Sequence, residues 1–210
     1  MAGALLFASS VARAEAPPAG TPLTPVVLGA RIGVQSLYLE GDGTPADLRG
    51  FVFAGDAGLR VGHYLSFAAV FEASLYGQRS DRVERGPTAT SYATFLEARA
   101  DTNPEGPLSL RIDLGTGCRW LAVPLDRGGR DHYWGFEPLH LRLGPSYRVT
   151  RAIDVAALGG LGFGWFSAHP GPGSGSCAVT GTCKDSLYNS DVQSAAHFVV
   201  DVSLALRGAI

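Results

Sequence analysis

Arginine and carboxylate side chains recur at alternate positions within otherwise apolar stretches of this 210-residue chain. The set comprises Arg31, Asp56, Arg60, Glu72, Glu97, Arg99, Asp101, Arg111, Asp113, Arg119, Arg142, Asp154, Asp201 and Arg207. Lys184 is the single lysine, and the planar guanidinium of arginine suits fixed pairing with carboxylates better than an ammonium group does. The two signs are nearly balanced, and charges enclosed in a protein interior must be paired. We therefore expect these side chains to form a network of ion pairs inside the folded chain.

The remaining candidates for chemistry give little support for catalysis or cofactor binding. His140 and His197 share the parity of the charges, and no Ser-His or His-Asp-Ser spacing typical of a hydrolase stands out. The GLGFG segment at 160–164 is not a dinucleotide fingerprint, because no helix is expected after it. No zinc signature and no basic cluster occur, and the net charge is only -2. We expect no cofactor, no metal, no nucleic-acid partner and no enzymatic activity.

Two cysteines lie close together in the Gly/Ser-rich segment that contains SCAVTGTCKD. Exported proteins keep disulfides, so we predict a disulfide between Cys177 and Cys183. A metal site there is less favoured, because only His169 is nearby as a further ligand. Cys118 lies on the apolar parity, where we expect a small lipid-facing side chain.

A polar segment, DRGGRDHYWG, contains His132 together with Asp126, Arg127, Arg130 and Asp131. These residue types could bind sugar or phosphate groups at a cell surface, such as those of lipopolysaccharide. A solvated polar loop explains the same composition. Both interpretations place the segment outside the core of the protein.

The first sixteen residues, MAGALLFASSVARAEA, are typical of a secretory signal peptide, although they lack a basic start. An apolar run from Ala4 to Val11 precedes small residues that permit cleavage after Ala14 or Ala16. The Pro-rich residues 17–25 predict a flexible lead-in. No later run of about eighteen apolar residues predicts a membrane-spanning helix. An exported chain of this kind is secreted, periplasmic, or a barrel of the outer membrane.

The alternation of apolar and polar residues predicts eight strands. We expect them at residues 26–39, 51–61, 65–78, 92–101, 108–122, 137–149, 153–166 and 195–210. The connections at 62–64, 102–106 and 150–152 are short, whereas those at 41–46, 79–91, 124–135 and 169–192 are long. Short turns on one side and long loops on the other are typical of outer-membrane barrels. The expected fold is all-β, an eight-stranded antiparallel up-and-down transmembrane β-barrel over residues 26–210.

Either face of such strands could point inward. A soluble, lipocalin-like binding barrel has its apolar face inside, whereas a membrane barrel reverses the order. The apolar faces carry almost no charge over their central stretches, and their aromatic residues collect toward the long loops, as at a membrane interface. These aromatic residues are Tyr38, Phe51, Phe53, Tyr92, Trp120, Phe163 and Trp165. We therefore expect lipid outside and the charges inside, where Gly160, Gly162 and Gly164 relieve crowding or let the strand bend.

This pattern resembles the small eight-stranded outer-membrane barrels of Gram-negative bacteria, the OmpA/OmpX-type family. The resemblance covers about residues 25–210 and includes a last strand, VDVSLALRGAI, that ends the chain. It departs from the family at Ile210, where members commonly end on an aromatic residue.

The resemblance implies an outer-membrane location, contact with membrane lipids, assembly by the barrel-insertion machinery, and a monomer. No peptidoglycan-binding domain is expected after the barrel. Eight strands enclose a lumen that side chains fill, so a wide channel is not expected. The expected function is a structural or surface-interaction role, or minor permeation, with an outer-membrane lipid-modifying enzyme as an alternative.

Overall fold

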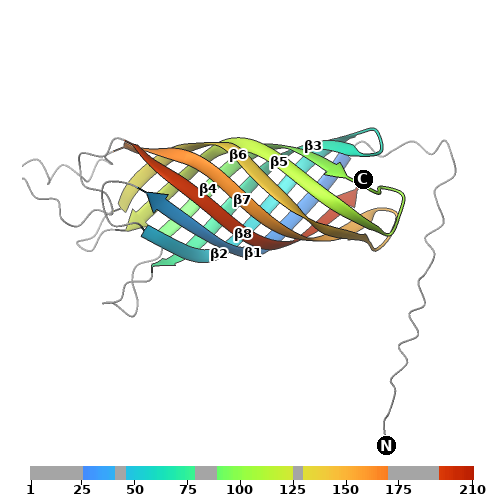
Figure 1. Ribbon diagram of the computed structural model, residues 1–210, viewed down its shortest axis with the longest axis horizontal. Helices are drawn as coiled ribbons and strands as arrows, with labels where there is room; N and C mark the ends of the chain where they lie inside the picture. The colour runs from blue at the N-terminus through green and yellow to red at the C-terminus, as the bar shows by residue number, and fades with distance from the viewer. Residues whose placement is uncertain (1–25, 41–45, 79–88, 125–129, 170–193) are drawn as a thin grey trace, which may run out of the picture.

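The computed structural model describes residues 26–40, 46–78, 89–124, 130–169 and 194–210. They form a closed barrel of eight antiparallel strands in sequence order (Figure 1). The strands are β1 (Val26–Glu40), β2 (Ala46–Val61), β3 (Leu65–Gln78), β4 (Ala89–Asp101), β5 (Leu108–Pro124), β6 (Arg130–Arg148), β7 (Ile153–His169) and β8 (Ser194–Ala209). Pairing of β1 with β8 closes the barrel, which confirms the predicted fold class. The described residues contain no helix long and apolar enough to cross a membrane.

One end of the barrel, which we call the short-turn end, carries both the start of β1 and the C-terminus (Figure 1). There the backbone N–H of Ile210 donates to the carbonyl of Val26 at 3.1 Å. The β2–β3, β4–β5 and β6–β7 turns lie at this end, and Gly62 in the first of them has a φ of 75°, which favours glycine. The opposite, long-loop end carries the connections at 41–45, 79–88, 125–129 and 170–193, which lie outside the described residues.

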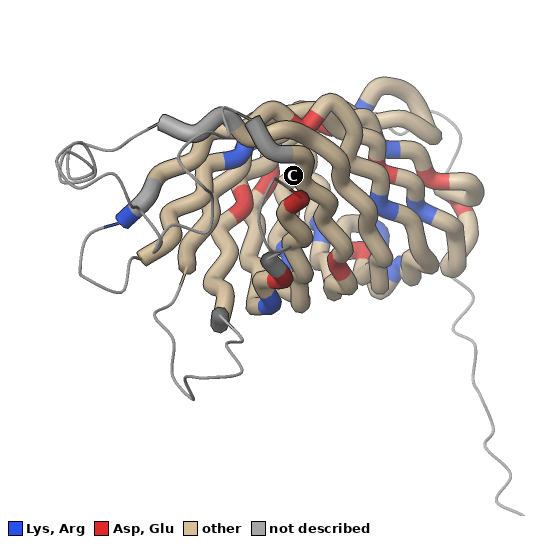
Figure 2. The backbone as a smooth tube through the Cα atoms, turned by 60° about the vertical axis from the view of Figure 1, so that its left-hand side comes forward, with Lys and Arg blue, Asp and Glu red and all other residues tan. Residues whose placement is uncertain are grey.

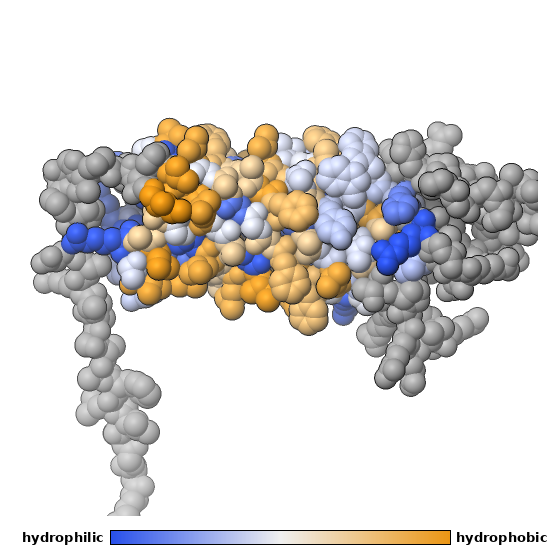
Figure 3. Space-filling model, turned by 180° about the vertical axis from the view of Figure 1, so that it is seen from behind, coloured by the Kyte–Doolittle hydropathy of each residue, from blue (hydrophilic) through white to orange (hydrophobic). Residues whose placement is uncertain are grey.

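The two faces of each strand have opposite environments. Leu96, Val202 and Phe51 are 70%, 62% and 61% exposed on the outer wall, whereas Glu72 and Arg119 are fully buried inside. Figure 3 shows the resulting apolar band on one side of the barrel, between more hydrophilic ends. Exposing so large an apolar wall to water is unfavourable, whereas the acyl chains of a bilayer solvate it. The apolar face therefore points outward and the charged face inward, as in a membrane barrel, and the soluble lipocalin-like alternative is not supported.

Strand β6 begins earlier than the sequence pattern predicted. It starts at Arg130, so much of the loop expected at 124–135 is strand. The alternation that predicts a strand is interrupted near Glu137, because Gly115 pairs with His140 while Gly117 pairs with Glu137. Two residues of β6 thus oppose one residue of β5, which is a β-bulge. Inward-facing residues therefore fall on odd positions before the bulge and on even positions after it. The regular alternation breaks there, so the part of the strand before the bulge was not predicted.

Candidate functional site

The lumen is organised around Glu72 on β3, which is fully buried. Its carboxylate contacts three arginines from three other strands. The Nη2 atoms of Arg31, Arg119 and Arg142 lie 2.9, 3.1 and 2.8 Å from its oxygens. Gln35 on β1 also donates its side-chain amide to Glu72 at 3.0 Å. One carboxylate therefore links β1, β5 and β6 across the barrel interior.

A second set of contacts extends from Arg142 toward the short-turn end. Arg142 pairs with Glu97 on β4, and its Nε lies 3.3 Å from Asp201 on β8. Arg99 lies 2.9 Å from Glu97 and also pairs with Asp56 on β2. These contacts join strands on all sides of the barrel, and Figure 2 shows basic and acidic positions recurring on neighbouring strands along its length.

Glu137 is a member of the lumen that the alternation did not identify. The bulge in β6 turns it inward, where it is fully buried and lies 3.1 Å from Nε of Arg119. His140 and His197 flank its carboxylate at 3.6 and 3.5 Å. The signal in the sequence was a carboxylate on the apolar parity followed by Pro138, a pair that fits poorly in a regular lipid-facing strand.

We call the connected ion pairs the lumen network. Its members are Arg31, Arg99, Arg119, Arg142, Asp56, Glu72, Glu97, Glu137 and Asp201. Arg111 and Asp113 form a buried pair of their own at 2.8 Å. At the short-turn end Arg207 binds Asp101 and Asp154 at 2.8 and 2.9 Å, and Arg148 lies 3.4 Å from Asp154. Arg60 is half-buried there, with Asp154 and Asp101 among its charged neighbours.

The glycines on the inner face of β7 make room for this network. A Cβ atom on Gly160 would lie 2.2 Å from an Asp201 oxygen, and one on Gly164 would lie 2.7 Å from the His197 ring. A Cβ on Gly162 would lie 3.1 Å from Nδ1 of His140. The glycines therefore relieve crowding, as the sequence suggested, opposite two histidines, the Asp201 carboxylate and the stem of Arg142.

An apolar cap fills the lumen at the long-loop end. Its buried residues are Leu37, Leu39, Leu48, Tyr76, Ala89, Leu121, Val123, Tyr133, Phe166 and Val199. Tyr76 donates its hydroxyl to Gln35, which in turn binds Glu72, so the cap rests directly on the lumen network. The alternation did not predict this cap, because the large apolar side chains were expected on the outer wall.

The other predicted site residues lie outside the described residues or at the long-loop end of the barrel. Cys177, Cys183, Asp126 and Arg127 fall outside the described residues, so the disulfide remains a prediction. Arg130 and His132 are exposed at the long-loop end of β6.

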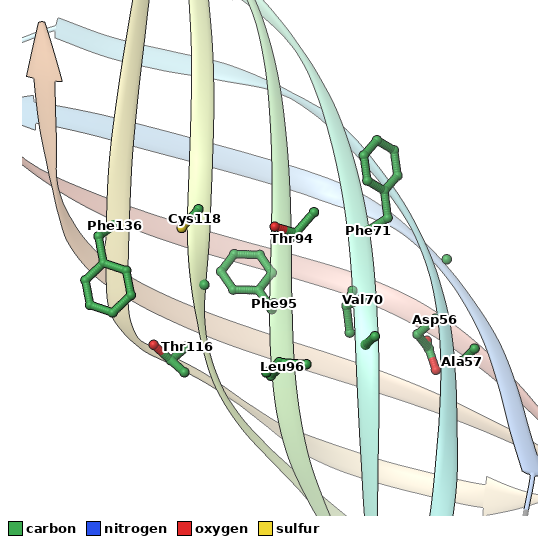
Figure 4. A pocket seen from close by; sticks show the side chains of 13 residues that line it. Asp56, Ala57, Val70, Phe71, Thr94, Phe95, Leu96, Thr116, Cys118 and Phe136 are labelled. Carbon is green, nitrogen blue, oxygen red and sulfur yellow. The ribbon is translucent and has the colours of Figure 1, made fainter.

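Cys118 lies on the outer wall in a hollow between Phe71 and Phe136 (Figure 4). Small side chains such as Ala69 and Thr94 line this hollow. It opens on the apolar band of the wall, where membrane lipid covers it. Its lining also includes Asp56 of the lumen network, on β2. The described residues contain no group of His, Cys, Asp and Glu suited to a metal ion.

The apolar wall, the closed eight-stranded barrel and the charged interior define a transmembrane β-barrel of the outer-membrane type. The solved structure of Neisserial surface protein A is similar to it, with a TM-score of 0.59 and 16% identity over 90% of this chain and all of that one. Ail, the attachment invasion locus protein of Yersinia pestis, gives 0.46 and 12% over 87% of this chain and 99% of its own. The outer-membrane protease OmpT from Escherichia coli gives 0.41 and 9% over 90% and 99%.

At these identities the first similarity shows a shared fold. No protein-family model and no curated protein matches the chain. The fold and the lipid-facing wall place the protein in an outer membrane.

Proposed function

We propose that this protein is an outer-membrane anchor that displays its long connections at the cell surface, and that its lumen is closed to solutes. The observation that carries the proposal is the filling of the lumen. The ion pairs around Glu72 cross the barrel, and the apolar cap covers them on the long-loop side. A solute would have to displace both the ion pairs and the apolar cap to pass through the barrel.

The energetic barrier to passage is the separation of buried ion pairs. Removing one partner of such a pair typically costs about 3–5 kcal/mol, because the other charge is left uncompensated. Single ions could pass only when pairs exchange, so any permeation is minor. A role as a scaffold fits this barrier, and no arrangement in the described lumen resembles a nucleophile with its activating base.

Conductance in planar bilayers tests the closed lumen. Purified protein is expected to show no current, or small and infrequent openings. Matched recordings from a Glu72→Ala variant, which loses the central carboxylate, are expected to show more frequent openings. Large, steady, porin-like currents from the unmodified protein would overturn the proposal and make it a diffusion channel.

A surface role also needs a binding partner. Two exposed residues support a negatively charged partner. Arg130 and His132 lie at the long-loop end of β6, directly above the lipid-facing Trp134. Phosphate groups of lipopolysaccharide lie near the surface of an outer membrane, and exposed side-chain N–H donors bind phosphate oxygens. A double variant, Arg130→Ala with His132→Ala, is expected to retain less lipopolysaccharide after detergent extraction than the unmodified protein. Equal retention would remove this part of the proposal.

A further inference from the structure

The outer wall carries a second hollow beside the one that Cys118 lines. It extends from Val61, the last residue of β2, to Leu139 on β6. The volumes of the two hollows are about 800 and 700 Å³, within the range of sites that hold small apolar ligands. Both are lined by Ala57, Ala69, Leu96 and Thr116. The two hollows are therefore parts of one depression, which we call the wall groove.

The depth of the wall groove comes from the sizes of its side chains. Ala57 on β2 and Ala69 on β3 are partners in the strand register, so two methyl groups lie together where the hollows meet. Larger rings stand on either side, and Figure 4 shows Phe71 and Phe136 flanking the upper hollow. A row of small side chains between bulky ones makes a channel in a wall that is otherwise convex.

The polar group of Thr116 does not require water in the groove. Its hydroxyl donates to the backbone carbonyl of Glu137 at 3.2 Å, at the bulge in β6. A hydroxyl that is satisfied within the protein can face hydrocarbon without an unpaired donor. The groove can therefore be filled by an apolar chain.

A groove of this kind distinguishes one lipid chain from the rest of the bilayer. Inside a membrane there is no hydrophobic force between a chain and the wall, because the surrounding lipid is equally apolar. Preference then depends on dispersion contacts, which grow with the number of neighbouring protein atoms. A chain on a convex wall touches protein on one side, whereas a chain in the groove touches the floor and both rims.

The lower end of the groove reaches the membrane surface at the short-turn end. Val61 and Leu59 line it there, directly before the β2–β3 turn. Short turns of outer-membrane barrels lie on the periplasmic side. His63 and Tyr64 in this turn are exposed, and tyrosine is favoured at the level of lipid headgroups. Imidazole N–H and phenol O–H groups are donors that phosphate oxygens accept.

A second copy of the barrel fits the groove less well than a lipid chain does. A twofold dimer places the same patch of each subunit against itself. Two depressions that face each other enclose a void, and the atoms that line a void lose their contacts. A contact between the groove and a different face of another copy would not close and would produce chains of barrels. A slender, flexible acyl chain fills the groove without either penalty.

We propose that the wall groove binds an acyl chain of a phospholipid from the periplasmic leaflet, with the phosphate at the β2–β3 turn. The barrel then keeps this lipid when the surrounding bilayer exchanges. The site lies on the outside of the wall, so it goes beyond the proposed scaffold function and does not depend on a closed lumen.

Native mass spectrometry tests the proposal on protein folded in vesicles of phosphatidylethanolamine and phosphatidylglycerol and released in mild detergent. The unmodified barrel is expected to retain a phospholipid. Ala69→Phe fills the groove where the two hollows meet, so most of the bound phospholipid should be lost. Ala157→Phe makes the same change at an exposed position of β7 that lines neither hollow, and it should retain the lipid. The shift in gel mobility on heating verifies that each variant is folded.

The outcomes that overturn the proposal are distinct. No retained phospholipid on the unmodified barrel, equal retention by Ala69→Phe, or an equal loss from Ala157→Phe would each show that the groove is not a site. If Ala69→Phe does not fold, the smaller Ala57→Leu replaces it and carries the same expectation. Vesicles that also contain lipopolysaccharide test the source of the chain. Retained lipopolysaccharide that Ala69→Phe removes, in place of phospholipid, would overturn the periplasmic assignment. Conductance enters none of these readings, so they are independent of the closed lumen.

Discussion

At the scale of single residues, Glu72 is the carboxylate on which most of the lumen network depends. It pairs with three arginines, whereas Asp47 pairs only with the exposed Arg49. Glu72→Ala leaves buried guanidinium groups short of a partner and is expected to lower the free energy of unfolding by about 3–5 kcal/mol. Asp47→Ala should cost at most about 1 kcal/mol, because its pair is solvated. Denaturant unfolding in lipid vesicles compares the two, and equal losses would contradict a structural role for the network.

Leu161 on β7 tests whether the outer wall faces lipid. It is 60% exposed on the outer wall, between Leu141 and Val200 on the neighbouring strands. Leu161→Arg is expected to cost about 2–4 kcal/mol if it lies near the bilayer midplane, because lipid cannot solvate the charge. Leu161→Ala should cost much less, since lipid fills the space.

The same vesicle assay measures both Leu161 variants. A large loss from Leu161→Ala, comparable to the 2–5 kcal/mol of a core truncation, would mean that this face is packed against protein.

At the scale of one element, β7 shows why an inner face needs glycine. A Cβ on Gly164 would lie 2.3 Å from the carbonyl oxygen of Phe136, and backbone cannot move aside cheaply. Gly164→Ala is therefore expected to destabilise the barrel by roughly 1–3 kcal/mol. Gly159→Ala on the same strand meets nothing within 4 Å and should be neutral or slightly stabilising.

The midpoint of heat unfolding for the two glycine variants checks this prediction. Equal midpoints would show that the inner face of β7 has more room than its contacts indicate.

At the scale of the whole molecule, the closed barrel predicts how the protein fractionates and migrates. Every strand is hydrogen-bonded to two neighbours, so no edge is open to detergent. The exported protein is expected to sediment with outer membranes and to resist carbonate extraction. An unheated sample should run on a gel as a compact species that shifts on boiling. Recovery in a soluble periplasmic fraction would contradict membrane insertion.

Much of this architecture could be predicted from local alternation. Phe51, Phe53 and Phe71 fall on the outer wall and Arg99 and Arg111 in the lumen, as their parity indicated. Successive side chains of a strand point to opposite faces, so the sequence alone divides each regular strand into two surfaces. The scarcity of charge on one of them then identified lipid as its surroundings.

Only the tertiary structure decided which charges meet. Glu137 changed faces because a one-residue bulge reverses the parity of everything beyond it, and such a bulge depends on pairing with both neighbours. Arg142 reaches Glu72, Glu97 and Asp201 on three other strands, contacts that exist only once the barrel has closed. The sequence by itself determined the two faces of the strands, because alternation is a local property of the backbone. The partners across the lumen depend on strand register and barrel closure, which are properties of the whole chain.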